Sequence, residues 1–280
     1  MTVDRMEIDE IHRNCDLVGS GKVVKGSSMM SFPGLSDGES QREQKNGDGF
    51  SMASRRKRRK VNQESCAEKS EIPCSPVVLL AHGAGAPSSS DWMIRWKEML
   101  KKTLGAVEVV TFDYPYLAGG KRGVAPKAEK LIEFHLDVVK ETAAKFPGHP
   151  LILAGKSMGS RVSCMVSALN DDIKVSAVIC LGYPLKGAKG VIRDETLLEM
   201  GVPVMFVQGS KDPMCPLDKL EAVCNEMKAV TELHVIDGGD HSFKIGMKHL
   251  ETKGLTQDEV EDVALKAIAA FVSKSLAQSA

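Results

Sequence analysis

The chain has 280 residues and a formal net charge of zero, so no global field would steer it toward nucleic acid or an anionic membrane. No apolar run approaches the roughly 20 residues of a transmembrane helix, and no membrane span is expected. The seven cysteines are an odd number without CxxC spacing, which indicates reduced thiols and excludes a disulfide framework or a cysteine-based zinc site.

Residues 1–72 are predicted to be a disordered tail, because a segment so rich in polar and charged residues buries too little apolar surface to offset the entropy of ordering it. Its polar, acidic start is not typical of a signal or transit peptide, which favours an intracellular location, cytoplasmic or nuclear. Six consecutive basic residues at 55–60 are either a nuclear-import signal, a nonspecific polyanion contact or a solvated charge block. No aromatic residues are interleaved with them, so no specific nucleic acid binding is expected.

Six short apolar runs from residue 77 onward are predicted strands. Most are nearly continuous rather than alternating, as expected for strands covered on both faces. They are VVLLAH (77–82), VEVVTF (107–112), LILAG (151–155), VSAVICL (175–181), VPVMFVQ (202–208) and ELHVID (232–237).

Segments with helical spacing separate these runs, at 91–104, 126–146, 158–169, 217–227 and 256–276. The second opens with Pro126, a residue suited to a first helical turn. The last begins TQDE, which is close to a capping box. Alternating strands and helices predict one α/β domain over residues 73–280, with a mainly parallel sheet of about six strands and helices on both faces.

The tripeptide GKS at 155–157 is compatible in principle with two kinds of loop. A phosphate-binding loop needs a glycine at position 150, which is Pro150, and the next four residues belong to a predicted strand. The pattern G-x-S-x-G fits GKSMG at 155–159, directly between a strand and a helix. In such a tight turn, called a nucleophile elbow, the glycines avoid collisions and the serine hydroxyl projects at the carboxyl end of the sheet. Ser157 is therefore the predicted nucleophile.

Three other strand ends carry matching motifs. HGAG (82–85) follows the first predicted strand, GSKDP (209–213) the fifth and GGDHS (238–242) the sixth. Their order along the chain, with the acid after the serine and the histidine last, is that of an α/β-hydrolase triad. Four motifs at the ends of strands are far more specific than any one of them.

Asp212 and His241 complete the predicted triad, with His241 as the base and Asp212 orienting its imidazole. His249 is the reserve candidate for the base, and Asp218 is the second choice for the acid. Asp240, beside His241, is expected to be a turn or helix-cap residue, because neighbouring side chains in a tight turn usually diverge.

The backbone N–H groups of Ala84 and Met158 are predicted to bind the oxyanion, since preorganised donors of this kind stabilise developing negative charge. Gly83 and Gly85 are expected to let the first of these loops approach closely.

Candidate substrate-binding residues complete the site: His82, Gly83, Tyr114 and Tyr116. Both tyrosines follow the second strand and should fall on the active edge of the sheet. His82 is expected to act mainly as a structural hydrogen-bonding group. Arg161, in the first turn of the elbow helix, is expected to pair with Asp113 or Asp194.

The predicted domain resembles the α/β-hydrolase superfamily. More narrowly, it resembles the branch that contains testis-expressed hydrolase-like proteins and subunit 3 of the non-specific-lethal histone-acetyltransferase complex. The narrower match rests on AHGAG (81–85), GKSMGSR (155–161), YPLKGAKG (183–190), QGSKDP (208–213) and GGDHSF (238–243). HGAG followed by G-x-S-M-G is also similar to monoacylglycerol-lipase-type enzymes. The chain starts at what would be the third strand of the superfamily, and little sequence follows residue 183 where larger relatives insert a cap, so no large cap is expected.

The leading hypothesis is an intracellular serine hydrolase that cleaves an ester, thioester or activated amide of a small-molecule acyl substrate. It implies no metal and no organic cofactor. The alternative is a hydrolase-shaped interaction module of a nuclear or chromatin-associated complex with protein partners, which the resemblance and the basic run both support. Every triad member can be assigned, whereas scaffolds freed from catalysis commonly lose one, so the enzyme is favoured; fold alone does not decide between the two.

Overall fold

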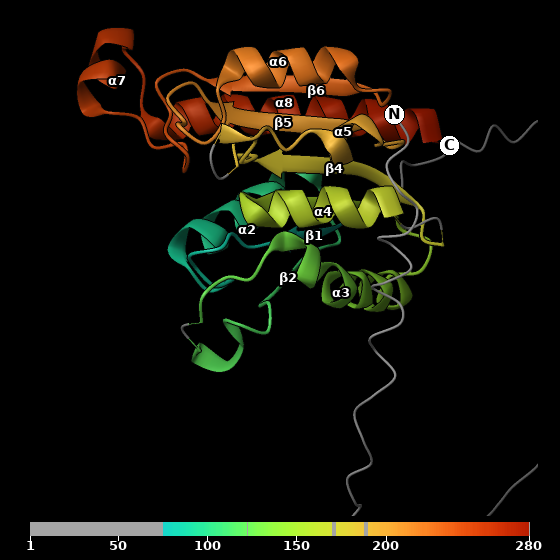
Figure 1. Ribbon diagram of the computed structural model, residues 1–280. Helices are drawn as coiled ribbons and strands as arrows, with labels where there is room; N and C mark the ends of the chain where they lie inside the picture. Colours follow the sequence, from blue (N-terminus) through green and yellow to red (C-terminus); the bar gives the residue numbers. More distant parts are fainter. Residues whose placement is uncertain (1–74, 122, 170–171, 188–189, 280) are drawn as a thin grey trace, which may run out of the picture. The chain divides into compact units, whose positions relative to one another are not determined.

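The computed structural model describes residues 75–279, apart from 122, 170–171 and 188–189 (Figure 1). The predicted tail at 1–72, including the basic run at 55–60, lies outside the described residues. None of the helices in the described part of the chain combines the length and hydrophobicity of a membrane-spanning segment.

Six strands form one parallel sheet in the order β2-β1-β3-β4-β5-β6 (Figure 1), so the prediction of a parallel sheet of about six strands is confirmed. Because all six run in the same direction, their carboxyl ends meet at one edge, where α/β sheets bind their ligands. The strands are β1 (Val77–Ala81), β2 (Glu108–Phe112), β3 (Leu151–Lys156), β4 (Val175–Leu181), β5 (Val204–Gly209) and β6 (Thr231–Ile236).

The connections between the strands are mostly helical. The α-helices are α2 (Asp91–Leu104), α3 (Ile132–Lys145), α4 (Met158–Leu169), α5 (Glu195–Leu198), α6 (Leu217–Glu226), α7 (Met247–Lys253) and α8 (Gln257–Ser279), and the 3-10 helices are η1 (Ala118–Gly120) and η2 (Ala128–Leu131). Between β4 and β5, the described residues form the four-residue α5 and an isolated antiparallel bridge between Lys186 and Ile192, and no large cap.

Two of the predicted helices are informative in their details. The segment predicted at 126–146 is divided into η2 and α3, and Pro126 lies outside both, so the prediction that it opens the helix is wrong. The capping box is confirmed: the Thr256 N–H donates to Glu259 Oε2 at 2.8 Å, and the Glu259 N–H donates to Thr256 Oγ1 at 3.2 Å.

The sheet separates two hydrophobic cores. Along β1, Val77, Leu79 and Ala81 belong to one core, which also contains side chains from α3, α4, α5 and α6. Val78 and Leu80 belong to the other, together with side chains of α2 and α8. Both faces of the sheet are therefore covered, which explains why the strands read as continuous apolar runs.

We expect Leu153→Ala to lower the free energy of unfolding by about 2–5 kcal/mol, because it opens a cavity in the centre of β3, where Leu153 is fully buried. Leu169→Ala is the matched control: this leucine is 69% exposed at the end of α4, and its truncation should cost less than about 0.5 kcal/mol. Urea denaturation of both variants measures the difference. Equal losses would contradict the assignment of β3 to the centre of the core.

Candidate active site

Ser157 lies in the turn between β3 and α4, at a φ of +52°, which is rare for a residue with a side chain. The flanking glycines are required by contact. A Cβ atom on Gly155 would lie 2.3 Å from the backbone of Gly159, and one on Gly159 would lie 2.5 Å from the carbonyl oxygen of Ala81. The expectation that these glycines avoid collisions is therefore confirmed, and the serine is held in a strained conformation at the edge of the sheet.

Three side chains from distant parts of the sequence meet at this edge. His241 Nε2 lies 2.8 Å from Ser157 Oγ, and His241 Nδ1 lies 2.6 Å from Asp212 Oδ2. Ser157 follows β3, Asp212 follows β5 and His241 follows β6, so the common direction of the strands brings the three together. An ionised carboxylate only accepts hydrogen bonds, so Nδ1–H donates to Asp212 and Nε2 is left to accept from the serine hydroxyl.

The surroundings of Asp212 favour its ionised form. Burial opposes ionisation, but hydrogen bonds from His241 and from the Met214 N–H outweigh it and hold the pKa of the carboxyl below its usual value. Gln208 Nε2 donates a further hydrogen bond to Asp212. Gln208 was missed as a site residue, although a polar side chain at the end of a buried strand was a usable signal.

The reserve candidates lie in other contacts. His249 Nε2 is 3.1 Å from Asp237 Oδ2, and the side chain of Asp218 is 74% exposed on α6. Asp240 accepts hydrogen bonds from the backbone N–H groups of Ser242 and Lys244, so its expected role as a turn residue is confirmed. Neither reserve side chain is hydrogen-bonded to the hydroxyl of the elbow serine.

Lys156 connects the elbow to the histidine loop. Its Nζ donates to the backbone carbonyl of His241 and lies 5.3 Å from the ring centroids of both Trp92 and Phe243. Burial lowers the pKa of this lysine to about 8, although Asp212 and another carboxylate oppose the shift. The contact fixes the loop of the imidazole against the strand that carries the serine.

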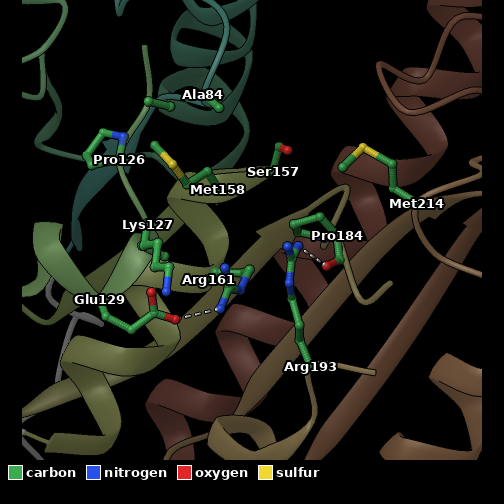
Figure 2. Close-up of a pocket in the computed structure, with 12 residues that line it drawn as sticks. Ala84, Pro126, Lys127, Glu129, Ser157, Met158, Arg161, Pro184, Arg193 and Met214 are labelled. Atoms are coloured by element: carbon green, nitrogen blue, oxygen red, sulfur yellow. Dashed lines mark hydrogen bonds and ion pairs between the residues drawn. The ribbon is translucent and has the colours of Figure 1, made fainter. Parts of the chain in front are cut away.

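Ala84, Ser157 and Met158 line one cavity of about 530 Å³ (Figure 2). Met158 is the first residue of α4, and the first N–H groups of a helix have no acceptor within it. The expected reason for two loop glycines is wrong: a Cβ on Gly83 would make ordinary contacts at 3.5 Å, and one on Gly85 would meet nothing within 4 Å.

The expected substrate-binding residues do not line this cavity. His82 is fully buried; its Nδ1–H donates to the Gly83 carbonyl at 2.6 Å, and its Nε2 accepts from the Tyr114 N–H at 3.0 Å. Burial lowers the pKa of His82, and its expected structural role is confirmed.

Tyr114 is also fully buried, so its prediction as a lining residue is wrong. The hydroxyl of Tyr116 donates to the carbonyl of Ala84 at 3.2 Å, which connects the loop of Ala84 to the segment after β2.

The other cavity residues come from segments beside the elbow. Arg161 donates to Glu129 Oε1 at 3.2 Å, so the expected pairing with Asp113 or Asp194 is wrong; η2, not the loops after β2 and β4, supplies the carboxylate. Beside Ala84, Ser157 and Met158, the cavity is lined by Ala125, Pro126, Lys127, Ala128, Glu129, Arg161, Pro184, Arg193 and Met214.

A parallel sheet with a serine in a strained turn after β3, and an acid and a histidine after β5 and β6, defines the α/β-hydrolase class. The chain matches the family described as an alpha/beta hydrolase domain over residues 74–273, and it belongs to that family.

Solved structures share this fold. An alpha-beta serine hydrolase homologue from Coxiella burnetii is 20% identical over 71% of this chain and 86% of that chain, with a TM-score of 0.52. Dienelactone hydrolase from Anabaena variabilis is 17% identical over 74% and 88%, also with a TM-score of 0.52. Est1E from Butyrivibrio proteoclasticus, with ferulic acid bound, is 21% identical over 72% and 92%, with a TM-score of 0.50. At sequence identities of 17–21%, this similarity shows a shared fold and nothing more.

The depressed pKa of Lys156 predicts a pH dependence of stability. Between pH 8 and 10.5 the folded protein has released this proton while the unfolded chain retains it, so the contribution of Lys156 to stability rises with pH. We expect the unfolding free energy of the wild type, relative to Lys156→Met, to increase by about 3 kcal/mol over this range. Urea denaturation at several pH values measures it.

Lys140→Met, at an exposed position on α3, is the control and should keep the pH profile of the wild type. If the unfolding free energies of the wild type and of Lys156→Met changed with pH in the same way, the lowered pKa of Lys156 would be contradicted.

Proposed function

We propose that this protein is a serine hydrolase that cleaves an ester, thioester or activated amide of a small-molecule acyl substrate through an acyl-enzyme. The observation that carries the proposal is the continuous line of hydrogen bonds from Asp212 through His241 to Ser157. A serine hydroxyl is a weak nucleophile by itself, and an adjacent base oriented by a third group is the arrangement that activates it.

In the acylation half of the reaction, Ser157 Oγ attacks the substrate carbonyl carbon while His241 Nε2 takes the hydroxyl proton. The Asp212 carboxylate stabilises the imidazolium that forms. Collapse of the tetrahedral intermediate breaks the bond to the leaving group, which receives the proton from His241. The acyl group is then attached to Ser157 through an ester bond.

In the deacylation half, a water molecule attacks the acyl carbon and gives its proton to His241. Collapse of the second intermediate returns that proton to Ser157 and releases the acid. The oxyanion of both intermediates would be bound by the N–H groups of Ala84 and Met158, which border the same cavity as Ser157. One such donor is typically worth about 3 kcal/mol of transition-state stabilisation.

Two structural neighbours, a serine hydrolase homologue and a dienelactone hydrolase, are consistent with hydrolytic chemistry on this fold. The narrower resemblance to testis-expressed hydrolase-like proteins and to subunit 3 of the non-specific-lethal complex stays a prediction, as do an intracellular location and the interaction-module alternative. The hydrogen-bonded triad favours the enzyme, because a scaffold needs no activated serine.

We expect a fluorophosphonate probe to label the purified protein, with Ser157 displacing fluoride from phosphorus. Ser157→Ala and His241→Ala should abolish labelling, and each should lower kcat/KM for 4-nitrophenyl acetate by about 10⁴-fold or more, because triad members act as a unit. Gel fluorescence and steady-state kinetics provide the two measurements.

His249→Ala is the control, since this histidine contacts Asp237 and should retain full labelling and activity. Circular dichroism verifies that each variant is folded. Labelling that persists in Ser157→Ala would overturn the assignment of the nucleophile.

A further inference from the structure

The cavity beside Ser157 contains an excess of positive charge. Lys127, Arg161 and Arg193 line it, and Glu129 is the one carboxylate among its lining residues (Figure 2). The charges come from three separate segments: the loop before η2, the first turn of α4 and the loop between β4 and α5. The tertiary structure therefore gathers cations that lie far apart in the sequence.

The two arginines differ in how they are held. Arg161, with a side chain only 13% exposed, donates to Glu129 at 3.2 Å. Arg193 Nη1 donates to the carbonyl oxygen of Pro184 at 3.1 Å, and among the described residues no carboxylate forms an ion pair with this guanidinium. In Figure 2, the guanidinium of Arg161 is turned toward Glu129 and that of Arg193 toward Pro184, on two segments that border the same cavity.

The positive charges repel one another. Burial, and after it the charge of Arg161, lowers the pKa of Arg193, although an arginine stays protonated at neutral pH. A single carboxylate cannot neutralise three cations, so an anion bound beside the two guanidinium groups would relieve their repulsion. Guanidinium groups also present several N–H donors in a planar fork that matches the oxygens of carboxylates and phosphates.

We propose that this cavity binds an anionic group of the substrate, a carboxylate or a phosphate, through Arg161 and Arg193, with Lys127 contributing charge. The inference deepens the proposed function, and its statement about substrates rests on that function. Because Ser157, Ala84 and Met158 border the same cavity, an anion at the arginines leaves the scissile carbonyl within the space beside the nucleophile. The substrate class is thus an acyl compound with a second, negatively charged end.

The first test compares two 4-nitrophenyl esters with five-carbon acyl groups, the hemiglutarate, which ends in a carboxylate, and the neutral pentanoate. We expect the wild type to prefer the hemiglutarate in kcat/KM by tenfold or more. Arg193→Gln should reduce that preference about 10- to 100-fold, the usual effect of losing a charge-assisted hydrogen bond. Glu129→Gln removes the opposing carboxylate and should raise the preference.

Lys140→Gln is the control variant, because it removes an equal charge from an exposed position on α3 outside the cavity and should leave both rates unchanged. A parallel comparison of acetyl-coenzyme A with neutral S-acetyl-N-acetylcysteamine tests phosphate. If the wild type prefers one of the anionic substrates and Arg193→Gln reduces that preference, the site is supported. The hemiglutarate would then identify a carboxylate as its anion, and acetyl-coenzyme A a phosphate. Absence of both preferences, or preferences that Arg193→Gln leaves intact, overturns it.

Calorimetry measures anion binding at this site independently of catalysis. Glutarate and inorganic phosphate are titrated into full-length Ser157→Ala, which cannot form an acyl-enzyme, and into the same variant carrying Arg193→Gln. Binding of either anion that weakens tenfold or more in the double variant supports the anion site even if the wild type hydrolyses no ester. Binding of neither anion overturns the site, while fluorophosphonate labelling of the wild type would leave the proposed hydrolase standing.

Discussion

The close approach of α4 to β1 and β3 is the contact on which the site depends. Side chains at Gly155 and Gly159 would collide with the backbone, so only glycines allow the helix to start where it does. The same turn holds Ser157 at a positive φ, and this backbone strain is offset by the packing of two hydrophobic cores around the central strands. The chain thereby presents a hydroxyl and the first N–H groups of α4 at a single point.

The order of the strands then determines what surrounds that point. β3 is central, with β1 on one side and β4, β5 and β6 on the other, so the loop of Ala84 and the loops of Asp212 and His241 approach the serine from opposite directions. Lys156 ties the last of these loops to the elbow with a partly buried hydrogen bond. A buried lysine of lowered pKa is costly, and its location suggests that positioning the imidazole outweighs that cost.

The short connection between β4 and β5 contributes a positive charge to the cavity. In place of a large cap, the described residues of this connection contribute the Pro184 turn and Arg193. A guanidinium is less hydrated than an ammonium group and can be partly buried at lower cost, so an arginine can stand beside the nucleophile and still face a ligand. Charge selection and acyl transfer would then take place in one cavity.

The sequence by itself determined the six strands, most of the helices and the assignment of Ser157, Asp212 and His241 to strand ends, because apolar runs and glycine-bounded turns depend on local chemistry. Only the tertiary structure decided which neighbours those groups have. It buried Tyr114, turned Arg161 to Glu129 and brought Arg193 to the cavity, since contacts between side chains far apart in the chain depend on how helices pack over the sheet. Periodicity records which face of an element is apolar, but it contains no information on which partner covers that face.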